Sequence, residues 1–386
     1  MTVNNIEKKG NINMAKKVPF YRPSIDNKEK AQLDEVLSSK TNKVEELENT
    51  FVKYTGATYA VATSDGTSAL HLAMLAINLK RGDKVLCSVN AYPSVPEVVR
   101  HFDAEPIFVD AQEESYNIDL DKLETILSDN QSKKLKAVIV SHIGGHPIDL
   151  ERLYNIAKIY NIRIVEDASE ALGGMYKGNK IGSTGADITT FSFNPHLKGH
   201  VCNGGMMVTD DEDLLERAQL LRNHAMVTPD ENLQYVYDVV DIGSKYDMSE
   251  LDAAYILAQI AKQDSAIQRQ KEIAARYTSK LKDAAHIILP KIVDEHIFSL
   301  YIIKVKKNRD SFARELLDNG IETGLHYIPL HLLSYYKAKY SLRVNDYPMA
   351  LRNFQQVLSI PVYADMSNAD VDYVCDTIIN ITKHWI

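Results

Sequence analysis

IRIVEDASE, at residues 162–170, begins with residues typical of a buried β-strand and continues into a polar turn. The strand would deliver Asp167 and Glu170 to its carboxyl end. A second β-like run, ITTFSF at residues 188–193, precedes a polar loop that contains Lys198. These two stretches therefore indicate buried strands that carry an acid and a lysine beyond their ends.

An acid that can hold a protonated ring nitrogen and a lysine that can form a Schiff base are the minimum requirement for pyridoxal phosphate chemistry. Taken singly, each residue has an ordinary explanation. An aspartate after a strand is more often a helix cap, and a lysine in a loop is more often solvated. The pair becomes a catalytic hypothesis only through the other motifs in the chain.

The composition indicates a globular protein with more than one core. At 386 residues, a large domain with a smaller one is expected. Charged residues make up 25% and apolar residues 45%, which is ordinary for a globular protein. The formal net charge of -8 argues against a nucleic-acid-binding surface. The sequence has no apolar run long enough for a membrane span, so we expect none.

The N-terminal residues and the cysteines indicate a cytoplasmic location. Residues 1–17 are polar and lack the apolar centre of a secretory signal, so we expect a flexible arm there. Cys87, Cys202 and Cys375 are odd in number and widely spaced. That pattern favours reduced thiols over a disulfide framework.

Short apolar runs alternate with helical segments from Tyr59 to about Asp210. This alternation predicts a mostly parallel sheet that is covered on both faces. We expect an arm over residues 1–17, a large domain over residues 18–260 and a small C-terminal domain over residues 261–386. The expected strands are 84–87, 106–109, 137–141, 162–165, 188–193 and 298–305, and the expected helices are 24–38, 44–54, 120–127, 150–160, 261–282, 309–319 and 368–382.

TSDGTSALHL, at residues 63–72, places small residues before an apolar helix. Free N–H groups at a helix start stabilise a phosphate, which makes Gly66, Thr67 and Ser68 candidate contacts. A plain capped helix start is the more common meaning of such a turn. Tyr92, just beyond a strand, could stack on an aromatic cofactor, although one of 21 tyrosines carries little weight alone.

Six motifs, in this order along the chain, resemble the DegT/DnrJ/EryC1/StrS family of sugar aminotransferases, a branch of the fold-type I pyridoxal phosphate enzymes. The resemblance runs from about residue 18 to the end. It implies an α/β fold with an aspartate-aminotransferase-like large domain, a mostly parallel mixed sheet and a smaller C-terminal α+β domain. The motifs are GDKV (82–85), VEDASEALG (165–173), FSFNP (191–195), GSKYDM (243–248), GIETGLHY (320–327) and LSIPVY (358–363).

The resemblance implies pyridoxal 5'-phosphate as the cofactor, with pyridoxamine 5'-phosphate formed during the reaction. Thr67, Ser68 and Ser192 would hold the phosphate. Tyr92 would stack on the pyridine ring. Asp167 would pair with the protonated ring nitrogen and keep the ring an electron sink.

Further cofactor contacts are carried over from the family in the same way. Glu170 would lie near the ring hydroxyl, and Gly66 and Asn194 would complete the cofactor-binding set. Lys198 would form the Schiff base and act as the general base. Lys245 falls where many members have an asparagine that reaches the phosphate of the neighbouring subunit. The resemblance therefore implies a homodimer with shared active sites.

The activity implied is transfer of an amino group from glutamate to a keto-sugar, usually a nucleotide-linked one. The amino sugar product would serve surface polysaccharide synthesis, such as that of lipopolysaccharide, or secondary metabolism. His326, Tyr327 and His331 are candidates for shaping the sugar site, and a purely structural role for the two histidines is an equal alternative.

The lysine loop departs from the family pattern. The usual loop has its lysine five residues after the serine, whereas here Leu197 takes that position and Lys198 follows it. Loop length is cheap to adjust, so Lys198 remains the predicted Schiff-base lysine. Relatives with a histidine in place of the lysine are sugar 3-dehydratases, and His196 keeps that alternative open. No metal is expected, because His196, His200 and Cys202 lack familiar zinc spacing and an evident fourth ligand.

Two other departures concern the substrate. The segment 38–43 is shorter than the glycine-containing stretch usual in the family, which leaves room for a different keto-sugar. Asp247 stands where arginine or asparagine is more usual, and an acid there would weaken attraction for an anionic substrate group. Two alternative functions remain, a pyridoxamine phosphate-dependent sugar dehydratase or deaminase on the same fold, and a non-catalytic regulatory protein.

Overall fold

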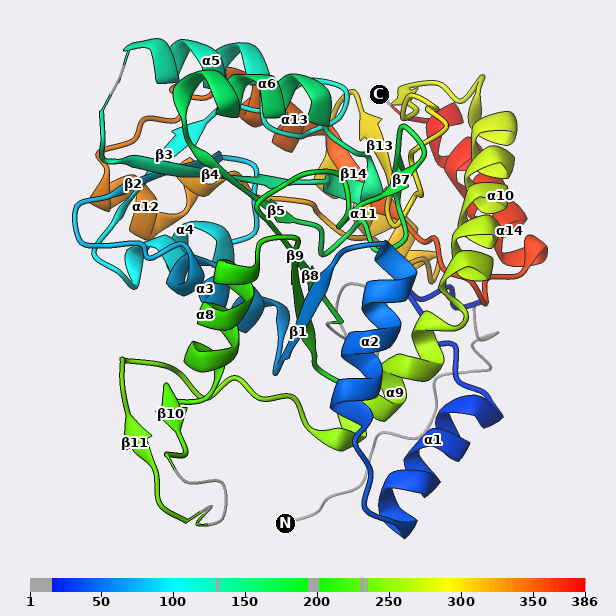
Figure 1. Ribbon diagram of the computed structural model, residues 1–386. Coiled ribbons are helices and arrows are strands. Elements are labelled where there is room, and N and C mark those ends of the chain that lie inside the picture. Colours follow the sequence, from blue (N-terminus) through cyan, green and yellow to red (C-terminus); the bar gives the residue numbers. More distant parts are fainter. Residues whose placement is uncertain (1–15, 130–131, 194–200, 230–232, 234, 386) are drawn as a thin grey trace, which may run out of the picture.

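The protein is described here from a computed structural model that covers residues 16–129, 132–193, 201–229, 233 and 235–385. Its main element is a seven-stranded sheet with the order β1-β9-β8-β5-β4-β2-β3 (Figure 1). Neighbours from β8 to β3 are parallel, and β9 is antiparallel to β8 and β1. The strands are β1 (Tyr59–Thr63), β2 (Lys84–Ser88), β3 (Glu105–Val109), β4 (Leu135–Ser141), β5 (Arg163–Asp167), β8 (Ile188–Ser192) and β9 (Gly205–Thr209).

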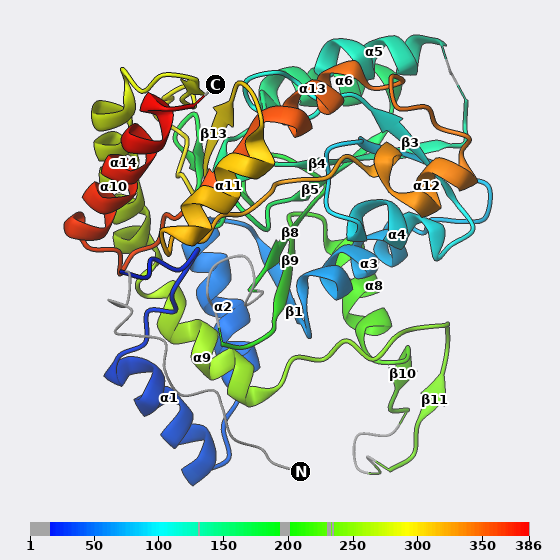
Figure 2. The ribbon, with the colours of Figure 1, turned by 180° about the vertical axis from the view of Figure 1, so that it is seen from behind.

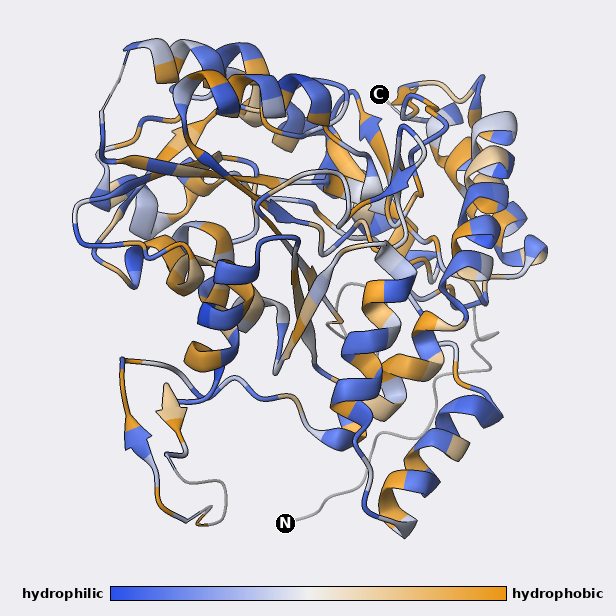
Figure 3. Cartoon of the chain, in the orientation of Figure 1, coloured by the Kyte–Doolittle hydropathy of each residue, from blue (hydrophilic) through white to orange (hydrophobic). Residues whose placement is uncertain are grey.

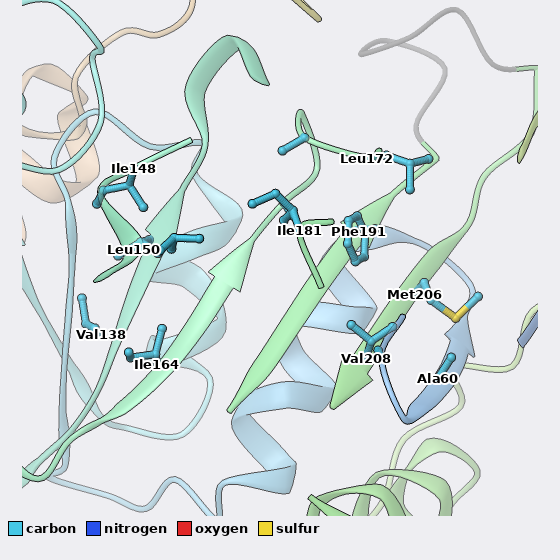
Figure 4. Packing of buried hydrophobic residues seen from close by; sticks show 14 of the residues in the cluster. Ala60, Val138, Ile148, Leu150, Ile164, Leu172, Ile181, Phe191, Met206 and Val208 are labelled. Atoms are coloured by element: carbon cyan, nitrogen blue, oxygen red, sulfur yellow. The ribbon is translucent and has the colours of Figure 1, made fainter. Parts of the chain in front are cut away.

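Consecutive side chains on a strand point to opposite faces of the sheet, and both faces are buried here. On β4, Val138 and Val140 pack with residues of α5 and α6, whereas Ile139 packs with residues of α3 and α4. Figure 4 shows the first of these clusters, in which Leu150 of α6 lies near Val138 and Ile164. Burial on both faces explains why these strands are continuous apolar runs in the sequence.

Helices cover the two faces of the large sheet. Residues of α3, α4 and α8 belong to one hydrophobic cluster, and residues of α2, α5, α6 and α9 to the other. Among the described residues, no helix is both long and apolar enough to span a membrane. The helices are α1 (Asn27–Ser38), α2 (Lys43–Thr55), α3 (Gly66–Ala76), α4 (Ser94–Arg100), α5 (Leu120–Asp129), α6 (Leu150–Tyr160), α8 (Glu212–Arg222) and α9 (Glu250–Ile260), with the 3₁₀ turn η1 (Ile143–Gly145).

A second, three-stranded sheet has the order β12-β13-β14 and is antiparallel throughout. Its helices lie together on the side away from β2 and β3 (Figure 2). Ile303, Phe312 and Val374 belong to its separate buried cluster. The elements are β12 (Ile287–Ile288), β13 (Tyr301–Val305), β14 (Val357–Ile360), α10 (Gln263–Leu281), α11 (Arg309–Asp318) and α14 (Asn368–Lys383). The expected fold class, a large mixed α/β sheet with a smaller α+β part, is confirmed.

The chain crosses between the two parts at several points. Val18 forms a bridge with Ile321 and packs in the cluster of the smaller sheet. Conversely, Leu330, Tyr336 and Ala350 pack in a cluster of the large sheet. Because segments of each part pack in the other, the expected boundary between a large domain over residues 18–260 and a small domain over residues 261–386 stays a prediction. The crossing elements are η2 (Leu330–Leu332), α12 (Ser334–Lys339) and α13 (Pro348–Gln356).

A two-stranded arm, formed by β10 (Met226–Val227) and β11 (Asp238–Val239), projects from the large sheet below α8 (Figure 1). Orange apolar patches lie along it in Figure 3. Tyr235 is 79% exposed and Ile242 is 82% exposed. Val236, Tyr237, Val239 and Val240 between them are exposed as well, and such a contiguous apolar patch is typical of a surface that binds another protein. A second short ribbon pairs β6 (Met175–Tyr176) with β7 (Asn179–Lys180).

Candidate active site

The carboxyl ends of β2, β4, β5 and β8 meet the start of α3 at one edge of the large sheet. In open α/β sheets, ligands bind at this edge. A cavity opens there, lined by residues at or beyond the ends of these strands and by residues of α3. Six residues expected from the sequence to contact a cofactor lie together on its wall, namely Gly66, Thr67, Tyr92, Asp167, Glu170 and Ser192.

The first turn of α3 presents unpaired donors. Asp65 caps the helix, since its Oδ1 accepts from the Ser68 amide at 2.8 Å and its Oδ2 from the Ser68 hydroxyl at 2.7 Å. The Ser68 hydroxyl is therefore engaged by the cap. Within the described part of the chain, the amides of Gly66 and Thr67 have no acceptor. They lie at the positive end of the helix dipole, where an anion is stabilised.

Gly66 lets β8 approach this turn closely. A Cβ on Gly66 would lie 2.5 Å from the Cβ of Ser192, so any larger residue would push the strand away. Ser192 also pairs with Gly205 of β9. Asn194 and Lys198 stand between these two residues in the sequence and lie outside the described residues.

Asp167 ends β5 and presents a carboxylate to the cavity. Its Oδ1 accepts from the Ser169 hydroxyl at 2.5 Å and from the Ser169 amide at 3.2 Å. Among the described residues, no group donates to its other oxygen, Oδ2. Burial raises the pKa of Asp167 above its ordinary value, and the two bonds from Ser169 and the nearby His142 oppose that rise. A cation in the cavity would favour the ionised carboxylate further.

Glu170 forms hydrogen bonds to a residue next to the large sheet and to a residue of the segment that leaves the smaller part. Its Oε2 accepts from the Gly144 amide, and its Oε1 accepts from the hydroxyl of Tyr327. Burial raises the pKa of Tyr327 well above its ordinary value, and Glu170 adds to that shift. Tyr327 therefore stays a neutral hydroxyl that donates to the carboxylate and closes one side of the cavity.

Tyr92 offers a free aromatic face. It is 53% exposed, and its ring meets Tyr327 edge to face with 5.9 Å between ring centroids. An exposed ring over a cavity is available for stacking on a flat ligand.

His142 was missed by the sequence analysis, although it also lines the cavity. Its Nδ1 accepts from the Ile148 amide at 3.3 Å, and its Nε2 lies 3.3 Å from Glu166 Oε2. Glu166 is fully buried and also accepts from the Tyr154 hydroxyl at 2.7 Å. These contacts fix the imidazole at the end of β4, which is the strand beside Asp167 of β5. The available signal was its position, because His142 directly follows the strand predicted at 137–141. A position just beyond a predicted strand also indicated Asp167.

The remaining candidates are not among the residues that line the cavity. His326 stacks on Phe20, and its Nδ1 lies 2.8 Å from the Ser359 hydroxyl. His331 is fully buried, and its Nε2 contacts the Val344 carbonyl oxygen at 3.1 Å. Lys245 is exposed at the base of the arm and pairs with Asp247. The described residues contain no cluster of metal-ligating side chains, and His196 and His200 lie outside them.

Comparison with known sequences decides the family. The sequence model of the DegT/DnrJ/EryC1/StrS aminotransferase family matches residues 23–379. The chain belongs to this family. It is 32% identical to the spore coat polysaccharide biosynthesis protein SpsC of Bacillus subtilis, over 95% of this chain and 97% of that protein. It is also 32% identical to GDP-perosamine synthase of Escherichia coli O157:H7, over 94% of this chain and 98% of that enzyme.

Solved structures agree with this assignment. The pyridoxal phosphate form of Spr1654 from Streptococcus pneumoniae, described as a sugar aminotransferase, superimposes with a TM-score of 0.87. The two chains are 28% identical, and the match covers 95% of this chain and 99% of the other. This member of the DegT/DnrJ/EryC1/StrS family is therefore a pyridoxal phosphate-dependent enzyme that uses a sugar and an amino donor.

The residues of the cavity fit pyridoxal phosphate. The unpaired amides of Gly66 and Thr67 suit a phosphate, and the missing Cβ of Gly66 lets the Ser192 side chain lie close to this turn. The buried carboxylate of Asp167 suits a protonated ring nitrogen. The exposed ring of Tyr92 suits the flat face of the pyridine.

Proposed function

We propose that the protein transfers an amino group from glutamate to a nucleotide-linked keto-sugar during the synthesis of a surface polysaccharide. The family assignment supports the reaction type, and the convergence of phosphate donors, carboxylate and aromatic ring on one cavity carries the proposal. Two relatives support the substrate class, since one is named for spore coat polysaccharide and the other for GDP-perosamine.

Each cavity residue has a proposed task. The Gly66 and Thr67 amides and the Ser192 hydroxyl bind the cofactor phosphate, and Tyr92 orients the ring. Asp167 holds the proton on the ring nitrogen. Bound pyridoxal phosphate supplies the electron sink that stabilises negative charge on the substrate carbon. The amine of Lys198 is proposed to move the proton at that carbon.

Glu170 and Tyr327 are proposed to bind at the other end of the ring. Their hydrogen bond leaves a polar edge on the cavity wall beside Tyr92. A ring hydroxyl of the cofactor or a sugar hydroxyl could donate to the oxygens there, because the Tyr327 proton is already donated to Glu170. His326 adjoins Tyr327 in the chain and is proposed to shape the sugar site, whereas the buried contact of His331 with a carbonyl favours a structural role for that residue.

A homodimer is part of the proposal. The apolar surface of the arm, around Tyr235 and Ile242, is too exposed to be explained by folding of one chain. Lys245 stands at the base of this arm and does not line the cavity of its own chain. It would reach the cofactor phosphate of a second copy as a point charge.

The first experiment follows the two half-reactions by absorbance. Glutamate added to the purified enzyme is expected to remove the visible absorbance of the bound cofactor, and a nucleotide-linked keto-sugar is expected to restore it. Lys198→Ala should abolish both changes, whereas the exposed Lys337→Ala should behave like the unaltered enzyme.

Three results would count against the proposal. Glutamate could fail to change the absorbance, or only free keto-sugars could restore it. In the third, the Lys198→Ala enzyme would turn over at an unaltered rate. Cofactor that borohydride never links to the protein would instead favour a dehydratase or deaminase.

A further inference from the structure

We propose that Ser169 is a positioning residue for Asp167, because its hydroxyl and amide hold one carboxylate oxygen and leave the other free for the cofactor ring nitrogen. The inference rests on the proposed role of Asp167 in the cofactor site. It assigns Ser169 no contact with the substrate.

The geometry of the turn after β5 carries this inference. Both donors of Ser169 reach the same oxygen, Oδ1, with the hydroxyl at 2.5 Å and the amide at 3.2 Å. The turn itself is anchored, since the Ala168 amide donates to the Thr190 carbonyl oxygen of β8 at 2.8 Å. The carboxylate therefore cannot rotate without losing two bonds, and Oδ2 stays available in the cavity.

The surroundings of Asp167 make these two bonds important. Burial disfavours its charge and raises its pKa. In this part of the structure, Ser169 is the residue whose hydrogen bonds stabilise the ionised form. A neutral aspartic acid could not pair with a protonated ring nitrogen. The titratable groups that line the same cavity are Asp65, Tyr92, His142, Glu170 and Tyr327.

The test measures the affinity of the apo-protein for pyridoxal phosphate across pH. Ser169→Ala is expected to weaken binding about ten-fold, as for loss of a hydrogen bond to a charged group. It should also move the half-maximal pH for binding upward, because Asp167 would ionise less readily. Ser169→Thr keeps the hydroxyl and should restore both values, and Ser265→Ala, in the first turn of α10 and outside the cavity lining, should change neither.

The outcomes separate this inference from the proposed function. Unaltered affinity and pH midpoint in Ser169→Ala, with weakened binding in Asp167→Asn, would overturn the role of Ser169 alone. A folded Ser169→Thr protein that binds as poorly as Ser169→Ala would also overturn it. Unaltered affinity in Asp167→Asn would overturn the cofactor site itself.

Discussion

At the scale of single residues, Asp167 shows how function competes with stability. The carboxylate is buried beside a cavity, and that burial raises its pKa. The folded apo-protein therefore holds this proton more tightly than the unfolded chain does, and the charge costs stability once pH rises through the raised folded-state pKa. A cofactor with a protonated nitrogen would offset the cost. The buried charge of Asp167 therefore lowers the stability of the apo-protein and is compensated when the cofactor is bound.

Asp167→Asn should separate these two effects. The apo-variant should be more stable than the unaltered apo-protein at pH 7, because no charge is buried, and the gain should disappear at pH values below 3.8, the ordinary aspartate pKa. Turnover should fall by about 100-fold or more, as for loss of a key electrostatic contact. Thermal unfolding at several pH values and steady-state assays would measure both.

The exposed acid Asp376 provides the matched control, since Asp376→Asn should leave stability and turnover close to those of the unaltered protein. A less stable Asp167→Asn apo-protein at pH 7, or one with full activity when loaded, would contradict the assigned role.

At the scale of elements, regular hydrophobic periodicity predicted the structure well. The helix expected at 150–160 coincides with α6, and the strand expected at 137–141 lies within β4. Both have apolar patterns set by the faces they bury, which is information that the local sequence holds. The antiparallel insertion of β9 between β1 and β8 could not be predicted this way, because strand order depends on contacts distant in sequence.

Side-chain partners were harder to predict than elements. The small-residue turn correctly indicated a helix start, but it did not indicate that the Ser68 hydroxyl donates to Asp65, and the expected contact of Ser68 with a phosphate stays a prediction. The sequence does not show whether the Ser68 hydroxyl points toward the helix cap or into the cavity. His331 was similarly ambiguous, because only the packing of η2 against the segment near Val344 shows where its ring lies.

The arm of β10 and β11 leads to a prediction about the assembly of two copies of the chain. Tyr235 and Ile242 expose apolar surface that a second copy would bury. If the proposed homodimer uses this surface, the double variant Tyr235→Ser/Ile242→Ser shifts it toward monomer in sedimentation experiments. Ile159→Ser, at a 70% exposed position on α6, should leave the assembly unchanged. A double variant that remains fully dimeric would place the interface elsewhere.

At the scale of the whole molecule, the cavity lies where the two parts meet. Strand β5 contributes Asp167 and the turn after it contributes Glu170, and the segment that leaves the smaller part contributes Tyr327. Phe20, near the N-terminus, packs against His326 in the same region. The shape of the cavity therefore depends on how the two parts pack against each other.

We propose that Lys198 forms the covalent link to a cofactor bound at the carboxyl edge of the large sheet. Borohydride reduction of the holoenzyme, followed by proteolysis and mass spectrometry, locates that link. We expect the reduced cofactor on the peptide that contains Lys198, and no such adduct in Lys198→Ala. An adduct on a different lysine, or a bound cofactor that never becomes linked to the protein, would contradict it.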